Sequence, residues 1–258
     1  MDRGRKQQKL DFVLNRLQLG WREGFDVSAY REVVSSFPKT WEEHVAYECG
    51  QPARKLTFEY RLDQLSKTVR LTYFLDQLLS RVVDELTPLL TEFSDDLESS
   101  IYLVLAGHYR QATALLRFAC ENALLDQYLK KHKKYKAWEE GTLFVPSGNR
   151  LIDGVFGKDY IINAELKDHI LRLSSFVHTN TPTVINDSLA LISFQKKRFD
   201  AWYEFFQCSC ILITKILLAF QTIRTNGLFN KMWLEFKLAT GVDRTSLEKT
   251  VWKLKSRE

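Results

Sequence analysis

The chain has 258 residues, of which 45% are apolar and 27% charged, and its net charge is +5 at pH 7. These values exclude a collagen, a coiled-coil rod and a disordered tail, and a chain of this length needs neither disulfides nor a metal to bury a core. Glycine (11 residues) and proline (5 residues) are scarce, which argues against a sheet-rich protein with many tight turns. The composition therefore favours an all-α fold.

Cysteine usage and hydropathy indicate the compartment. The cysteines are Cys49, Cys120, Cys208 and Cys210. They form no CxxC pair and fit no zinc spacing, so we expect free thiols in a reducing cytoplasm. The basic residues 1–9 are not followed by an apolar stretch, so no secretory signal is expected. The most apolar run, residues 208–220, is shorter than the roughly 20 residues of a membrane span, so we expect a buried core helix and no membrane contact.

Helical spacing of apolar residues along the chain predicts about nine helices in three regions. Residues 1–56 form a small N-terminal helical region, with helices over 6–19 and 26–36 and a third that begins in a capping box at Thr40. Residues 57–225 form the central helical bundle. Residues 226–258 carry C-terminal helices around 231–238 and 245–255.

The central bundle is expected to begin with a long helix over residues 56–90, which Pro88 kinks or ends. Ser94 is the expected N-cap of the next helix, which ends near Gly107. Residues 108–131 give the strongest helix, and its apolar residues on most sides predict a central position. Residues 137–162 are expected to form a loop. Two further helices, over 163–178 and 193–223, complete the bundle.

Lysines crowd the end of the predicted 108–131 helix. The candidate RNA-binding residues among them are Lys130, Lys131, Lys133 and Lys134. Lysines neutralise backbone phosphates whatever the base sequence, which makes a phosphate-binding patch one interpretation. The alternative is a solvated helix end, because the helix dipole favours cations there.

A pair of charges interrupts the same apolar helix. Arg117 and Glu121 are four residues apart and can face each other, and Arg110 lies two turns earlier on the same stripe. An isolated charge in such a helix is costly, so we expect the two side chains to be paired. They are either a structural ion pair that fixes helix packing or the polar wall of a functional site.

Arg172 and His178 are the candidate catalytic residues. His178 lies in the last turn of its predicted helix, where the helix C-terminus favours the imidazolium form. Arg172 lies six residues earlier, roughly 9 Å along the axis and about 120° around it. An arginine that holds a phosphate and a histidine that moves a proton suffice for metal-independent RNA cleavage. The alternative is a histidine with a packing role at the helix end.

These residues resemble the HEPN superfamily of helical proteins, whose members carry an arginine, four to six further residues and a histidine near the end of a core helix. Residues 107–121 (GHYRQATALLRFACE) and 173–179 (LSSFVHT) are similar to one bacterial branch of HEPN-like proteins. The resemblance covers roughly residues 60–225. It implies a bundle that pairs as a homodimer, with the two motifs facing each other in an RNA-cleaving site. Such proteins often serve as toxins or effectors in antiviral defence.

One residue departs from the family pattern, because Leu173 follows Arg172 where active members usually carry a polar residue. Two functions therefore stay open. The first is a HEPN-like metal-independent endoribonuclease in bacterial antiviral defence, which needs no cofactor, acts on RNA and is expected to meet an antitoxin or another defence protein. The second is a non-catalytic helical scaffold that binds RNA or protein within a defence complex.

Overall fold

The computed structural model describes residues 55–82, 86–105, 108–157, 161–177, 196–220 and 227–247. These segments contain eight named helices and no strand, so the predicted all-α fold is confirmed for the described part of the chain. The helices expected within residues 1–54 lie outside it.

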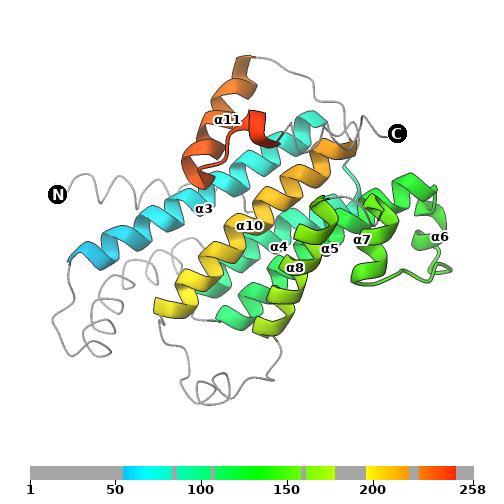
Figure 1. Cartoon of the computed structure of the whole chain (residues 1–258), viewed down its shortest axis with the longest axis horizontal. Helices are drawn as coiled ribbons and strands as arrows, with labels where there is room; N and C mark the ends of the chain where they lie inside the picture. Colours follow the sequence, from blue (N-terminus) through cyan, green and yellow to red (C-terminus); the bar gives the residue numbers. More distant parts are fainter. Residues whose placement is uncertain are drawn as a thin grey trace, which may run out of the picture.

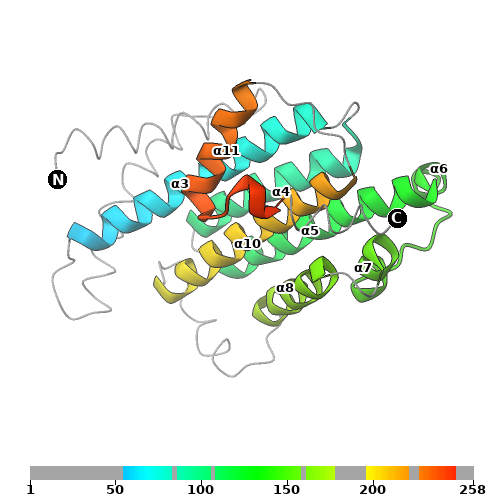
Figure 2. The same cartoon turned by 45° about the horizontal axis from the view of Figure 1, so that its top comes forward.

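Four long helices form the body of the molecule (Figure 1). They are α3 (Lys55–Val82), α4 (Pro88–Leu105), α5 (Tyr109–His132) and α10 (Lys196–Phe220). Helix α8 (Ile161–Val177) packs against α5 and α10, and α11 (Gly227–Thr240) packs against α3. The second view shows α11 on the side of α3 and α8 on the opposite side of the bundle (Figure 2). The apolar faces of these helices meet between them and exclude water, which is the main stabilising contribution to such a bundle.

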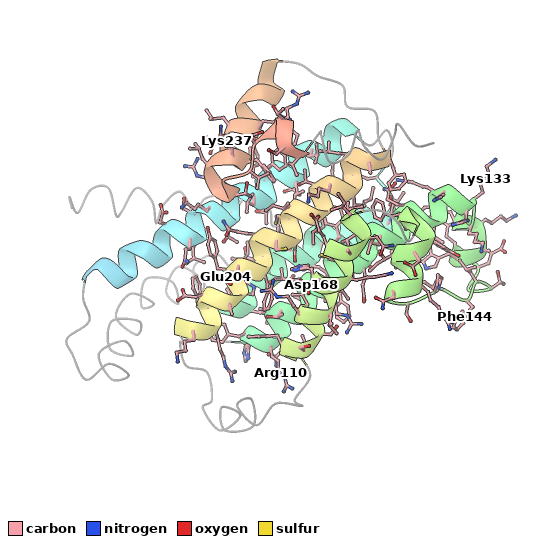
Figure 3. The ribbon with its side chains drawn as sticks, in the orientation of Figure 1. Arg110, Lys133, Phe144, Asp168, Glu204 and Lys237 are labelled. Atoms are coloured by element: carbon pink, nitrogen blue, oxygen red, sulfur yellow. The ribbon has the colours of Figure 1, made fainter. Side chains whose placement is uncertain are left out.

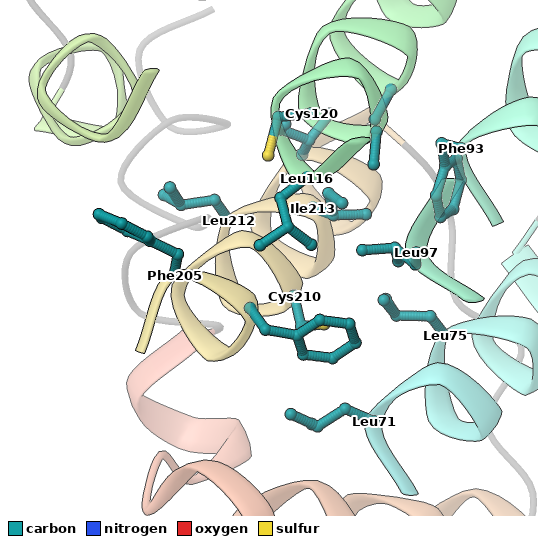
Figure 4. Close-up of a cluster of buried hydrophobic side chains, with 14 of the residues drawn as sticks. Leu71, Leu75, Phe93, Leu97, Leu116, Cys120, Phe205, Cys210, Leu212 and Ile213 are labelled. Atoms are coloured by element: carbon teal, nitrogen blue, oxygen red, sulfur yellow. The ribbon is translucent and has the colours of Figure 1, made fainter. Parts of the chain in front are cut away.

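The core draws side chains from all four long helices. Leu75 from α3, Leu97 from α4, Leu116 from α5 and Ile213 from α10 point toward one another (Figure 4). The buried Trp202 donates from Nε1 to Ser100 Oγ at 2.8 Å. Ser100 in turn donates to the backbone oxygen of Ala112 at 2.8 Å. This chain ties α10, α4 and α5 together inside the apolar core, where unpaired polar groups would be costly.

Helix α4 begins earlier than the sequence predicted. Thr87 caps it, because the Thr87 backbone oxygen accepts from the amide of Thr91 and its Oγ1 lies 3.3 Å from the amide nitrogen of Leu90. Pro88 occupies the first helical position, where its missing amide hydrogen costs nothing. The prediction of Ser94 as the N-cap was wrong. Ser94 lies within α4 and donates to Asp76 of α3 at 2.5 Å.

The segment expected to be a loop contains two helices, α6 (Tyr135–Glu139) and α7 (Asn149–Phe156). Helix α7 has an apolar face that packs on α5 and α8. Its buried residues are Leu151, Ile152, Val155 and Phe156. The loop prediction over 137–162 was therefore wrong for α7, because buried apolar contacts outweigh the low helix propensity of Gly154.

Among the described helices, α10 is long and apolar enough to cross a membrane. Its most apolar stretch has a mean hydropathy of 1.5, and 67% of that stretch is buried within the protein. A core helix of a bundle passes the same test. Cys120, Cys208 and Cys210 are free thiols, as expected, while Cys49 lies outside the described residues.

Helix α11, from the expected C-terminal region, shares the core of the bundle. Phe74 of α3 packs edge-on against Trp233, with ring centroids 5.1 Å apart, and against Phe236 at 4.6 Å. The Arg70 guanidinium of α3 pairs with Glu235 beside these rings. The helix is thus fixed to α3 by aromatic contacts and an ion pair.

Candidate functional site

Arg172 lies on the exposed side of α8, on the helix where the sequence placed it. Its guanidinium carbon is 5.4 Å from the centroid of the Phe205 ring on α10. At that distance the ring attracts the cation and orients the guanidinium. Helix α8 is described up to Val177, so the other candidate catalytic residue, His178, is the next residue of the chain and lies outside the described residues.

A second histidine, His169, lies one turn before Arg172 and is buried. Its Nε2 is 2.8 Å from Ser209 Oγ, whereas its Nδ1 has no hydrogen-bond partner. Burial lowers the pKa of His169 to about 4, and the charge of Arg172 acts in the same direction. A neutral, enclosed imidazole cannot exchange protons with a substrate at neutral pH, so His169 has a packing role here.

Neither Cys208, which lies near Arg172, nor Cys120 is activated. Burial raises the pKa of the Cys208 thiol, although the positive charges of Arg172 and Lys215 oppose that effect. Burial also raises the pKa of Cys120 to about 12. Because the thiolate is the nucleophile, neither residue is suited to covalent chemistry at neutral pH.

Arg110 connects the start of α5 with the end of α8. Its Nε donates to the backbone oxygen of Val177 at 2.7 Å. Val177 is the last residue of α8, and its carbonyl is one of those that no amide of the same helix can reach. A guanidinium at this end also interacts favourably with the helix dipole. Arg110 therefore fixes the helix end on which Arg172 lies and after which His178 follows.

Arg117 and Glu121 form the predicted ion pair. Arg117 Nε donates to Glu121 Oε1 at 3.0 Å, and the two side chains are 29% and 24% exposed. The pair is therefore partly hydrated rather than fully buried. The two residues contact each other along α5, whereas Arg172 contacts Phe205 of α10.

Leu173 fills the core. Its side chain is completely buried, in the same apolar cluster as Leu116 and Ile170. A polar residue at this position would enter an apolar environment, which is unfavourable without a hydrogen-bond partner. Packing thus accounts for the leucine that follows Arg172.

Lys130 and Lys131 bind other parts of the protein. Lys130 Nζ donates to the buried Asp126 carboxylate at 2.8 Å. Lys131 Nζ donates to the backbone oxygen of Val155 at 2.9 Å, near the end of α7. Both cations are therefore partly committed to holding α5 and its neighbours in place.

Lys134 and Lys133 lie just beyond the end of α5. Lys134 Nζ is 5.5 Å from the centroid of the Tyr128 ring and 3.5 Å from its hydroxyl. The Lys133 side chain is exposed and has no partner among the described residues. Of the expected RNA-binding lysines, Lys133 is thus the most available to a ligand.

The structure separates the two groups of candidate residues. Arg110 lies at the start of α5 and Lys133 directly after its end, so the two residues are well separated in Figure 3. The helix between them has a rise of 1.5 Å per residue, which places them roughly 35 Å apart. Within one chain, the lysines therefore do not line the surface around Arg172.

No cluster of His, Cys, Asp or Glu side chains within the described segments is placed to hold a metal ion. No protein-family model matches the chain, and the searches of curated proteins and of solved structures gave no match either.

Sequence reasoning missed the contacts that orient Arg172 and Arg110. Phe205 and Val177 lie far from their arginine partners in the chain, so no local pattern announces them. A signal for His169 was present, because its spacing of three from Arg172 puts the two on one side of the helix. That spacing does not reveal that the imidazole is buried.

Proposed function

We propose that the chain is a HEPN-like metal-independent endoribonuclease that acts as an effector or toxin in antiviral defence. The observation that carries the proposal is the exposed Arg172 guanidinium, which Phe205 orients on the last turns of α8 just before His178. The Arg110 contact to Val177 supports it, because it holds the same helix end in place.

In the proposed reaction the ribose 2′-hydroxyl attacks the neighbouring phosphorus. His178 takes the proton of that hydroxyl as general base, and the 5′-oxygen leaves and is protonated. Arg172 stabilises the negative charge that develops on the phosphate oxygens in the transition state. The products are a 2′,3′-cyclic phosphate and a 5′-hydroxyl, and no metal takes part.

The outer side of α8 supports the proposed homodimer. Two large apolar side chains on α8, Ile161 and Leu171, are exposed and available to a second copy of the chain. The exposed residues of α8 as a whole are Ile161, Ala164, Asp168, Leu171, Arg172 and Ser175. The Leu171 side chain is 65% exposed next to Arg172. Leu171→Glu should therefore give a monomer in light scattering and reduce cleavage, whereas Leu238→Glu on α11 should change neither.

Cleavage of a mixed RNA substrate in EDTA tests the proposed chemistry. We expect wild type to leave 2′,3′-cyclic phosphates and His178→Ala to be slower by about a hundredfold or more. Arg172→Lys should restore only part of the activity lost in Arg172→Ala, because lysine cannot hold two phosphate oxygens at once. Lys237→Gln on α11, which belongs to neither group of candidate residues, is the control. Equal rates for wild type and His178→Ala would refute the proposal.

The scaffold alternative is favoured by Leu173, because the position that is usually polar in active relatives lies in the core. Growth of cells that express wild type or His178→Ala separates the two functions. Toxicity that requires His178 supports the nuclease. Binding of RNA or of a defence protein without any cleavage supports the scaffold.

A further inference from the structure

The loop after α6 presents a bare aromatic ring. Phe144 is 88% exposed, the highest value among the large apolar residues described. The loop itself is held in place, because the amides of Thr142 and Leu143 both donate to the backbone oxygen of Ala137, at 3.0 and 3.1 Å. Phe144 follows directly after this anchored pair. The ring is therefore displayed from a fixed backbone while contributing little to burial of apolar surface.

The stretch of chain around this ring is basic. Residues 130–150 contain six Lys and Arg and two Glu, so their net charge is +4, against +5 for the whole chain. Helix α6 begins directly after Lys134, and the loop that carries Phe144 is bonded to the middle of α6. Figure 3 shows Lys133 and Phe144 at the same end of the molecule. A polyanion that approaches this end meets both the cations and the ring.

Two of these cations, Lys133 and Arg150, lie at positions where another residue type would favour folding more. Lys133 has φ 53°, and it is the one non-glycine residue with a positive φ among those described. The Lys133 amide donates to the backbone oxygen of Lys130, and the Lys134 amide donates to the backbone oxygen of Leu129. Glycine is the favoured residue at a helix end of this type. Arg150 lies in the first turn of α7, where the helix dipole opposes a cation. A residue whose backbone or position is unfavourable for folding is a candidate for a function.

The side chains at this end differ in how free they are. Lys136 is 88% exposed, and its Nζ is 3.8 Å from Glu140, so this pairing is weak. Lys133 and Arg150 are exposed and have no partner among the described residues. These three cations can face a ligand without breaking a contact that holds the fold.

We propose that Phe144, Lys133, Lys136 and Arg150 form a contact site for single-stranded RNA. The ring stacks on one base, and the cations face the neighbouring phosphates, which is how proteins bind single strands without reading their sequence. The inference rests on the proposed RNA-directed function and gives it a binding surface at the other end of α5 from Arg110.

A single strand fits this surface better than a membrane. Only one apolar side chain is fully displayed, because Leu143 and Val145 are half-buried. The exposed Glu139 and Glu140 would be pressed against the anionic head groups of a bilayer, whereas a strand can pass beside them. A membrane-binding loop also needs a larger continuous apolar surface.

Binding of a labelled 2′-O-methyl oligouridylate of about 12 nucleotides tests the site, since site sizes of single-strand binders are of this order. This probe lacks the 2′-hydroxyl, so the proposed cleavage cannot act on it. Phe144→Ala should raise Kd about 5- to 150-fold with no change in melting temperature. Phe144→Trp should retain the affinity for the probe. The fluorescence of the introduced tryptophan should decrease on binding, because a base stacks on its ring. Leu238→Ala, an equally exposed apolar residue on α11, is the matched control.

Lys133→Gly separates charge from folding. The substitution removes one cation, so the slope of log K against log salt should become shallower by about 0.7. The melting temperature should rise, because glycine adopts the left-handed backbone of this position without strain. Lys237→Gln on α11 is the charge control and should leave the affinity for the probe unchanged.

The outcomes distinguish this inference from the proposed function. Equal affinity of Phe144→Ala and wild type overturns the RNA contact site, even if cleavage of ordinary RNA still depends on His178. Phe144-dependent binding of the probe upholds the site, even if no cleavage is found. Phe144-dependent sedimentation with vesicles of phosphatidylserine and phosphatidylcholine, without an effect on RNA binding, overturns it in favour of a membrane.

Discussion

The buried carboxylate of Asp126 should be the most sensitive polar position that the structure describes. Its side chain is 0% exposed and joins α5 to the start of α4 and to α6. Oδ1 accepts from Thr87 Oγ1 at 2.7 Å and from the Tyr135 hydroxyl. Oδ2 accepts from Gln127 Nε2 at 2.9 Å and Lys130 Nζ at 2.8 Å. Four donors on one carboxylate offset the cost of taking its charge out of water.

The loss in Asp126→Ala can be worked out from these donors. Gln127 is itself buried, so its amide is left without a partner at a cost of about 1–3 kcal/mol. Thr87 and Tyr135, which are both half-buried, lose charge-assisted bonds. Lys130 is a third exposed and is rehydrated at little cost. The free energy of unfolding should therefore fall by about 3–5 kcal/mol.

Asp126→Asn should cost less, about 1–2 kcal/mol, because the new amide can donate to the two hydroxyls while its oxygen keeps Gln127 and Lys130. Lys130→Gln should cost less still, about 1 kcal/mol or below. Urea unfolding followed by circular dichroism measures the three free energies. In thermal unfolding, Asp126→Ala should lower the melting temperature by about 6–20 °C.

The order Asp126→Ala, Asp126→Asn, Lys130→Gln is the test of the reasoning. A loss below about 1 kcal/mol for Asp126→Ala would mean that desolvation of the carboxylate cancels its four hydrogen bonds. The same experiment bears on RNA binding. A Lys130→Gln variant that lowers RNA affinity has to be compared with its own loss of stability before the lysine is assigned to a binding surface.

Three further predictions concern charges in the core and along α5. Burial lowers the pKa of His169 from 6.5 in the unfolded chain to about 4 in the folded protein. As the pH falls from 6.5 to 4, the unfolded chain binds this proton first, so the free energy of unfolding should fall by up to about 3 kcal/mol. In urea titrations His169→Leu should make that fall smaller. Burial, and after it the charge of Glu92, raises the pKa of Asp96 to about 7. The protonated Asp96 carboxyl stabilises the fold at pH 4, and this stabilisation is lost as the pH rises to 7. Asp96→Asn should therefore stabilise the protein by about 1–3 kcal/mol above pH 7, but not at pH 4. A double-mutant cycle of Arg117→Met and Glu121→Gln should give a coupling of about 0.5–1 kcal/mol, because the pair is partly hydrated, and a value of 3 kcal/mol would contradict its exposure.

Local patterns were sufficient for the elements whose cause is local. Helix α5 follows from apolar residues at helical spacing along its whole length, and it was predicted to within one residue at each end. The Arg117–Glu121 pair follows in the same way, since four residues of helix bring the two side chains together. These features depend on neighbours in the chain, which the sequence displays directly.

Helix α7 and the start of α4 needed more than a local pattern. Gly154 argues against a helix, yet the apolar face of α7 is buried on α5 and α8. Ser94 has the chemistry of an N-cap, but it bonds across to Asp76 of another helix. In both places tertiary contacts outweigh the intrinsic preference of the residue, which amounts to about 1 kcal/mol.

The sequence by itself determined the all-α class, the central helix and the chemical types of the candidate residues, because composition and helical periodicity act within a few residues of chain. The tertiary structure alone decided which of them meet. It placed Arg172 over Phe205, bonded Arg110 to Val177, and committed Lys130 and Lys131 to partners inside the protein. It also left Phe144 bare, away from Arg110. Exposure and pairing arise when separate helices pack, and that packing depends on contacts between residues that are distant in the sequence.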